Sequence, residues 1–145
     1  MNVGNLILLA FIICAVYSDL TQTKISNRLI GLGLIVGVAF RIWAEGSSGI
    51  LFYIVNISLP VILLYLLFQM RALGAGDIKL FSMIGAFLST EQLLQVMVLA
   101  FCAGAVFGIL KIGYQCIVLR IGHGRFTQIH FSPAILVAYI IVIWR

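Results

Sequence analysis

Long apolar segments separated by short polar stretches run through the whole chain. Six of them predict helices at membrane depth, because a helix needs roughly 20 apolar residues to cross the hydrocarbon core and fewer where one end is buried in protein. The segments span Val3–Tyr17, Leu29–Trp43, Gly49–Phe68, Ile78–Leu88, Leu93–Leu119 and Phe131–Trp144. The first and fourth adjoin a carboxylate, so we expect their helices to continue into the polar flank, beside a water-accessible cavity.

The composition agrees with a membrane protein. Of the 145 residues, 63% are hydrophobic and 9% are charged, whereas soluble domains carry roughly a quarter charged residues. The mean hydropathy is +1.22. Because little sequence remains outside the apolar segments, residues 1–145 are expected to form a single membrane-embedded domain. The predicted fold class is therefore all-α, a polytopic integral membrane protein with about six transmembrane helices.

The distribution of basic residues predicts how this bundle is oriented, because cytoplasmic loops are enriched in Lys and Arg. The other loops and chain ends hold Arg41 and Arg145. Alternate loops hold Lys24, Arg28, Arg71, Lys79, Arg120 and Arg125. This asymmetry predicts a multi-pass plasma-membrane protein with its N-terminus and C-terminus outside. The net charge of +5 is then explained by topology and by contact with anionic membrane lipid, and no nucleic-acid partner is expected.

Two of the four acidic residues lie against apolar segments. Asp19 follows the first segment, and Asp77 stands between Gly74-Ala75-Gly76 and the fourth. A carboxylate near hydrocarbon costs a few kcal/mol, so its presence suggests a function. Glycines let the backbone bend and let another segment approach closely, while a helix N-terminus favours a carboxylate in its first turn. Two structural explanations stay open: Asp77 caps its helix, and Asp19 caps a turn or pairs with Lys24.

Two carboxylates held within a few Å of each other would form an aspartyl active site at the cytoplasmic face. They cannot both ionise easily at that distance, so they share one proton. The ionised member then acts as general base on a water molecule, and the protonated member hydrogen-bonds the scissile carbonyl. This chemistry needs no metal or cofactor, and we expect none. A small proton or cation transporter that uses the same carboxylates remains the alternative, and an inactive assembly subunit is a third possibility.

Several other polar residues are candidates for supporting roles. Lys79 and Lys111 either contact lipid headgroups or face the site, where they would orient substrate or act on the carboxylates. Lys24 and Asn27 either order the loop beside Asp19 through hydrogen bonds or belong to a plain turn. His123 lies with His130 in a glycine-containing basic stretch that offers no clear metal-ligand set.

Further positions are interpreted as structural. Arg41 is assigned to an outer loop, and Asn56, Ser58 and Gln69 are interpreted as interhelical hydrogen-bonding groups. Trp43, Trp144, Tyr53 and Tyr139 are expected to anchor the bundle at the membrane interface or to pack within it.

The segments around the two aspartates carry a family resemblance. Asp19 followed by Lys24-Ile25-Ser26-Asn27-Arg28 resembles the first-aspartate segment of type IV prepilin peptidases, the GxGD aspartyl membrane proteases. Gly74-Ala75-Gly76-Asp77-Ile78-Lys79-Leu80 is similar to the second-aspartate segment of that family, with its lysine two residues on. The stretch Ile129–Leu136, which contains Pro133, looks like the proline-containing opening of the last helix in the family.

The resemblance implies an aspartic endopeptidase, a hydrolase that removes the leader of prepilin-like substrates for type IV pilus assembly or protein secretion. Asp19 and Asp77 match the catalytic pair of the family. Substrates of such enzymes have a polar, basic leader, a small residue before the cut and a hydrophobic helix after it. Long family members carry an N-terminal extension with zinc-binding cysteine pairs that is associated with methylation. This sequence resembles the short forms without it, so we expect peptidase activity and no methylation.

Overall fold

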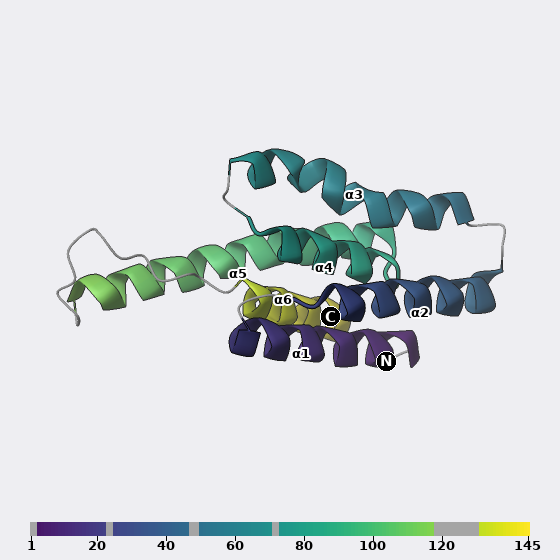
Figure 1. Ribbon diagram of the computed structural model, residues 1–145, viewed down its shortest axis with the longest axis horizontal. Coiled ribbons are helices and arrows are strands. Elements are labelled where there is room, and N and C mark those ends of the chain that lie inside the picture. The colour runs from purple at the N-terminus through teal and green to yellow at the C-terminus, as the bar shows by residue number, and fades with distance from the viewer. Residues whose placement is uncertain (1–2, 23–24, 47–49, 71–72, 118–130) are drawn as a thin grey trace.

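The computed structural model describes residues 3–22, 25–46, 50–70, 73–117 and 131–145, and within them all regular structure is helical. The helices lie antiparallel to their neighbours along the chain (Figure 1). Their bounds are α1 Val3–Gln22, α2 Asn27–Glu45, α3 Ile50–Gln69, α4 Ala75–Gly85, α5 Thr90–Ile117 and α6 Ser132–Trp144. The predicted all-α fold class is therefore confirmed, and each predicted apolar segment corresponds to one helix.

The helix ends next to the two carboxylates differ from the apolar segments in an informative way. Helix α1 continues past Tyr17 to Gln22, so Asp19 lies inside its last turn. Within this polar turn the Thr21 hydroxyl donates to the Tyr17 carbonyl at 2.8 Å. Helix α4 begins at Ala75, three positions before the predicted Ile78, and so includes Asp77 in its first turn. Both carboxylates are thus attached to helices.

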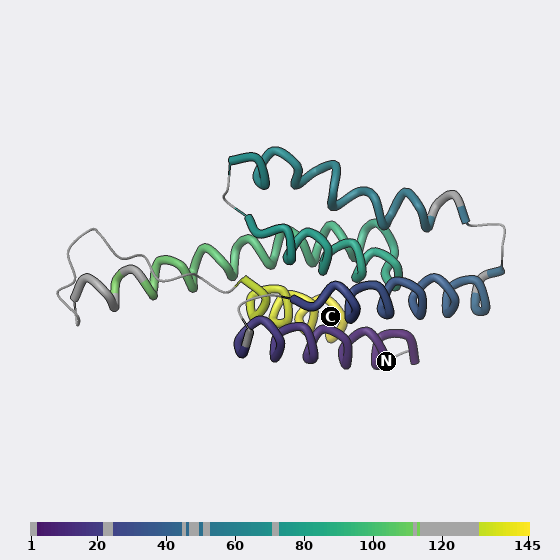
Figure 2. The backbone as a smooth tube through the Cα atoms, viewed as in Figure 1, coloured from purple at the N-terminus to yellow at the C-terminus, as the bar shows by residue number. Residues whose placement is uncertain are grey.

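Helix α4 forms the centre of the bundle. It contacts α1, α2, α3 and α5, and the backbone trace shows it between α3 on one side and α1, α2 and α6 on the other (Figure 2). From Leu80 to Leu88 every residue is buried. At about 1.5 Å per residue, its 11 residues give a length of roughly 16 Å, which is too short to cross a bilayer alone. Helix α4 is therefore a core element that the other helices surround.

Close backbone packing holds α3 against α4. A Cβ atom added at Gly85 would lie 2.5 Å from the Asn56 carbonyl oxygen, so only glycine allows this approach. Pro60 lies inside α3 and is buried. Proline removes one backbone hydrogen bond from a helix and bends it, and α3 is visibly bent in Figure 1.

Two long-range hydrogen bonds fix α6 against α1. Ser132 donates to Asp19 at 2.5 Å, and Tyr139 donates to the Asn5 carbonyl at 2.7 Å. Because Asp19 is at the end of α1 and Ser132 at the start of α6, the two helices run antiparallel. The start of α1 and the end of α6 therefore both lie away from Asp19, as the N and C labels in Figure 1 indicate. The alternating directions of α1 to α6 lead to this arrangement.

The outer surface of the bundle is apolar, as expected for a polytopic membrane protein. Among the residues that the structure describes, three helical stretches are long and apolar enough to cross a membrane, namely Val3–Thr21, Asn27–Ala44 and Thr90–Lys111. Shorter apolar helices cover Tyr53–Gln69 and Ser132–Trp144. Many large apolar side chains on these helices are exposed, including Trp43 at 84% and Trp144 at 81%. In a bilayer such side chains face lipid, and exposed tryptophans at helix ends are typical of interface anchors.

Arg41 corrects one prediction. We assigned it to an outer loop, but it lies inside α2 and is only 9% exposed. Its guanidinium donates to the Leu88 carbonyl at 2.9 Å and stacks over the Tyr53 ring at 5.1 Å from the centroid. The α4–α5 turn presents this carbonyl to α2, which explains how a basic residue is accommodated inside an apolar helix.

Asn56 completes the same polar group. It is fully buried, donates to the Leu88 carbonyl at 3.1 Å and accepts from the Thr90 hydroxyl at 2.7 Å. Its predicted role between helices is therefore confirmed. We call Arg41, Tyr53, Asn56, Leu88 and Thr90 the arginine cluster. Gln69 behaves differently, because it donates to Tyr65 in its own helix. Ser58 lines a groove that is formed by residues of α2, α3 and α4.

Candidate active site

Asp19 lies half-buried in the last turn of α1. One of its carboxylate oxygens, Oδ2, accepts a hydrogen bond of 2.5 Å from Ser132, the first residue of α6. Ser132 has no exposed surface. A short hydrogen bond to a carboxylate is among the stronger kinds found in proteins, so this contact defines the position of one oxygen atom.

Asp77 lies half-buried in the first turn of α4, after the N-cap residue Gly74. Its backbone N–H donates to the Gly74 carbonyl at 3.2 Å. A Cβ atom added at Gly74 would lie 3.1 Å from Asp77 Oδ2, closer than most real contacts of this kind. Gly74 therefore leaves the space in which the carboxylate folds back over the helix start.

Gly76 differs from Gly74 in what surrounds it. The nearest atoms to a Cβ added there belong to Ile25, at 3.5 Å, which is an ordinary van der Waals distance. The site has room for a methyl group, so Gly76 is not required here by close approach. The contact nevertheless shows that Ile25, in the segment after Asp19, packs on the turn that carries Asp77.

A hydrogen bond joins the same two segments. Lys79, on α4, donates to the Asn27 side-chain oxygen at 2.9 Å, although the two residues are 52 positions apart. Both side chains are exposed. The predicted alternatives for Lys79 were a lipid headgroup or a role at the site, and the structure gives it a partner from the first-aspartate segment. The start of α2 and the start of α4 are thereby tied together two residues from Asp77.

A cavity of about 390 Å³ opens beside Asp77. Asp77 is the one ionisable side chain among the described residues that line it. The others are apolar or small: Leu67, Leu73, Gly74, Phe101, Gly104, Ala105 and Phe131. The cavity therefore offers a carboxylate at the edge of an apolar space, which suits binding of an apolar group next to a polar reacting group.

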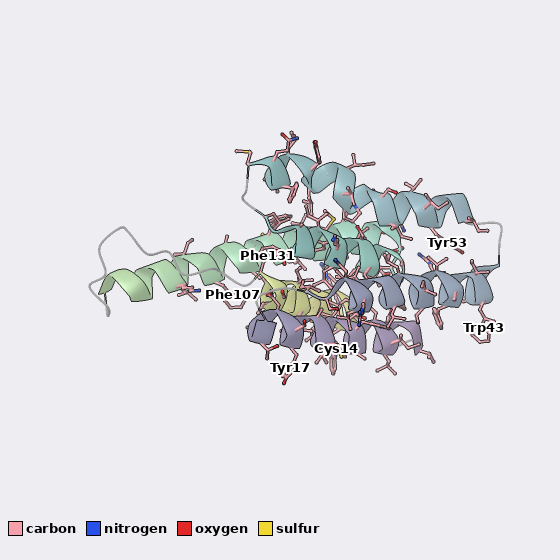
Figure 3. The ribbon with its side chains drawn as sticks, in the orientation of Figure 1. Cys14, Tyr17, Trp43, Tyr53, Phe107 and Phe131 are labelled. Carbon is pink, nitrogen blue, oxygen red and sulfur yellow. The ribbon has the colours of Figure 1, made fainter. Side chains whose placement is uncertain are left out.

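Aromatic rings form one wall of this cavity. Phe131 lies 5.5 Å from Phe101 and 6.3 Å from Phe81 between ring centroids. Figure 3 labels Phe131 where α4, α5 and α6 meet. A Cβ atom added at Gly104 would overlap the Phe131 ring, so this glycine allows the ring to lie against α5.

The start of α6 belongs to the surroundings of both carboxylates. Phe131 lines the cavity that contains Asp77, and the adjacent Ser132 donates to Asp19. Helix α1 also contacts α4 directly. The structure therefore gathers the end of α1, the start of α4 and the start of α6 at one end of the bundle, which is visible in Figure 1.

The remaining predicted residues lie elsewhere. Lys111 is half-buried on α5, seven residues beyond the cavity residue Gly104, or roughly 10 Å along the helix. It ends the apolar stretch of α5, and Figure 1 shows this part of α5 extending past the other helices. Lys24, His123 and His130 lie outside the described residues, as do Arg71, Arg120 and Arg125. Within the described part of the chain, no group of three His, Cys, Asp or Glu side chains is arranged to hold a metal ion.

Sequence reasoning missed Ser132 as a residue of the site. The available signal was a small polar residue at the start of an apolar helix, next to Pro133. That pattern is typical of a helix cap, and in the structure the hydroxyl instead bonds to Asp19, 113 positions away. Phe131 was missed because an aromatic residue in an apolar segment does not reveal which cavity it lines.

Comparisons with known proteins identify the family of the chain. Residues 6–109 match the type IV leader peptidase family, and this range includes Asp19 and Asp77. The chain is also similar to a prepilin leader peptidase/N-methyltransferase of Myxococcus xanthus (strain DK1622), with 53% identity over 45 residues. That match covers 31% of this chain and 13% of the relative. No solved structure matches.

Proposed function

Because the chain belongs to the type IV leader peptidase family, we propose that it is an aspartic endopeptidase that removes the leader of prepilin-like precursors. Asp19 and Asp77 form the catalytic pair and act on one water molecule. The active site faces the cytoplasm, and the protein is embedded in the plasma membrane. The proposal concerns the peptidase reaction alone.

One observation carries the proposal. The two aspartate segments are 58 positions apart in sequence, yet Lys79 donates to Asn27 across them. Ile25 also packs on Gly76, next to Asp77. These contacts join the segment that follows Asp19 to residues on either side of Asp77, and they support a site in which the two carboxylates act together. Two carboxylates that act on the same water molecule must lie close to each other.

The reaction follows from a pair that shares one proton. The ionised carboxylate takes a proton from water while the water oxygen attacks the scissile carbonyl carbon, and the protonated carboxyl donates a hydrogen bond to the carbonyl oxygen. The tetrahedral intermediate then collapses as a proton passes to the amide nitrogen and the C–N bond breaks. The leader leaves with a new carboxylate, and the remaining protein has a new amino terminus.

The cavity beside Asp77 is where substrate is proposed to bind. Its apolar lining, which includes Leu67 and Phe101, suits an apolar side chain adjacent to the scissile peptide. The polar leader would remain in water. The basic loops would repel a basic leader, so apolar contacts rather than charge attraction are expected to select the substrate.

The cytoplasmic orientation rests on the basic residues of alternate loops. Arg41 was counted on the outer side, but it is buried inside α2 and bonded to Leu88. A buried, bonded arginine is part of the bundle and is not a loop charge. Without Arg41, fewer basic residues remain in the loops on the proposed outer side, so the difference in basic loop residues between the two sides becomes larger. This difference supports the proposed orientation.

The decisive experiment measures cleavage of a prepilin-like precursor in membranes that contain the parent protein, Asp19→Asn or Asp77→Asn. Each substitution keeps the side-chain shape and removes the ionisable group. We expect each to lower cleavage by about a thousandfold or more, because neither half of the pair functions alone. Glu91→Gln is the matched control, since Glu91 is an exposed carboxylate in the first turn of α5, and it should cleave like the parent.

Insertion must be checked for each variant by its abundance in the membrane fraction. Cleavage that persists in both inserted asparagine variants would contradict the proposal. If those variants also lose a proton or cation flux that the parent shows, the transporter alternative would replace it.

A further inference from the structure

Ser132 makes an unusual use of its hydroxyl. Serine at the N-cap of a helix commonly bonds to a backbone N–H of the first turn, but the N-cap of α6 is Phe131 and Ser132 is the residue after it. Instead the hydroxyl donates to Asp19 Oδ2 at 2.5 Å. Ser132 has no exposed surface and Asp19 is half-buried, so this bond is partly shielded from water, which strengthens a hydrogen bond to a carboxylate.

A purely structural role would be to hold α6 against α1. A second hydrogen bond already holds these two helices together, because Tyr139 donates to the Asn5 carbonyl at 2.7 Å. Phe131 and Ile135 also belong to the apolar core around them. The two hydroxyl bonds differ in what they contact, since Tyr139 bonds to backbone and Ser132 bonds to a carboxylate of the proposed catalytic pair.

We propose that Ser132 is the positioning residue of Asp19. Its bond occupies Oδ2 and fixes the rotation of the carboxylate about its terminal torsion, which is otherwise broad. The second oxygen, Oδ1, is then held in one direction, where it can contact the catalytic water. The inference rests on the proposed function of Asp19, and it adds a residue outside the stretch 6–109 that matches the family.

The contribution of such a bond is to orientation rather than to substrate affinity. Ser132 itself reaches neither the water nor the substrate in this role. Removing it should leave substrate binding intact and allow the carboxylate to sample unproductive orientations. Misplaced catalytic groups lower the rate of the chemical step, so kcat should fall while KM stays nearly constant.

The test compares Ser132→Ala with Tyr139→Phe, since each removes one hydroxyl bond between α1 and α6. Cleavage of a prepilin-like precursor is measured over a range of substrate concentrations in detergent or reconstituted membranes. We expect Ser132→Ala to lower kcat by roughly 10- to 100-fold with KM within about twofold of the parent. Tyr139→Phe should keep kcat within about twofold, although its thermal unfolding temperature should fall.

Two outcomes overturn the inference. Either Ser132→Ala keeps the kcat of the parent, or both variants lose kcat in proportion to their loss of thermal stability. If Ser132→Ala does not insert, Ser132→Cys takes its place, because a thiol has a similar shape and is a weak donor. A parental kcat for Ser132→Cys would equally overturn the inference. These results are separate from the proposed function, which fails only if the parent does not cleave or the asparagine variants of Asp19 and Asp77 do.

Discussion

The two ends of the bundle place polar groups among apolar helices for opposite purposes. At one end the arginine cluster is closed, because Asn56 is fully buried and its amide bonds to both Leu88 and Thr90. At the other end Asp77 borders a cavity of about 390 Å³. Polar groups that bond only to protein stabilise a fold, whereas polar groups beside an open cavity are available to a substrate. The comparison separates a stabilising end from the end that is proposed to be reactive.

Helix α4 connects the arginine cluster at one end of the bundle to Asp77 at the other. Helix α4 begins beside Asp77 and ends just before the turn whose Leu88 carbonyl accepts from Arg41. Substitutions near the Leu88 carbonyl should therefore change stability and leave the chemistry intact. Substitutions near Asp77 should change the chemistry and leave stability intact.

The largest expected effect is on stability, at the closed end. Asn56→Ala removes two hydrogen bonds and leaves a void in a fully buried position. We expect the free energy of unfolding to fall by about 3 kcal/mol, with cleavage per folded molecule unchanged. Thermal or chemical unfolding in detergent measures the first quantity. Gln69→Ala is the control, because its exposed bond lies within its own helix, and it should change stability by less than about 0.5 kcal/mol.

The next effect is on the chemistry, at the open end. Gly74→Ala places a methyl group 3.1 Å from Asp77 Oδ2, so the carboxylate must shift by a few tenths of an ångström. We expect kcat for precursor cleavage to fall about tenfold, with little change in unfolding temperature. Gly76→Ala is the matched comparison, since its methyl group meets Ile25 at 3.5 Å, and it should stay within about twofold of the parent. Equal losses in the two variants would contradict this account of Gly74.

A smaller effect should follow from filling the cavity. Ala105 is exposed and lines it, whereas the next residue, Val106, is exposed on α5 but does not line it. Ala105→Phe is expected to lower kcat/KM about fivefold for a precursor with a large apolar residue next to the cut, and less for one with alanine there. Val106→Phe should discriminate between the two precursors as the parent does. A loss in Ala105→Phe that is independent of side-chain size would argue against the cavity as a binding pocket.

The smallest effect is expected at the bond between Lys79 and Asn27. Both side chains are exposed, so solvent competes with their hydrogen bond and its contribution is modest. Lys79→Met should lower cleavage about two- to threefold, and Asn27→Ala should have a similar effect. The double substitution is the informative measurement, since it should lower cleavage no further than either single one. Fully multiplicative losses would show that the two residues act separately.

Much of the fold could be predicted from the sequence, because hydrophobic segments determine which residues form helices in a membrane. The extension of α1 to include Asp19 and the position of Asp77 in the first turn of α4 were both expected from the polar residues at those ends. Arg41 was misplaced for a physical reason. A basic residue near the end of an apolar segment usually marks a loop, and its accommodation inside α2 depends on a carbonyl 47 positions away.

The site was less accessible to sequence reasoning than the fold. Asp19, Asp77, Asn27 and Lys79 could be identified as candidates from local patterns, since each lies in a short polar segment next to an apolar one. Their partners could not, because Ser132 contacts Asp19 across 113 positions. Local patterns indicate which residues are suited to chemistry, whereas only tertiary packing determines what each residue contacts.

The central position of α4 has a consequence for when the protein can act. The helix that carries Asp77 is short and contacts α1, α2, α3 and α5, so it cannot hold its place before those helices have assembled around it. A nascent chain with only its first helices in the bilayer would lack the proposed catalytic pair in its assembled form. Under the proposed function, cleavage would therefore begin only after all the helices around α4 have inserted, and incompletely inserted copies would be inactive.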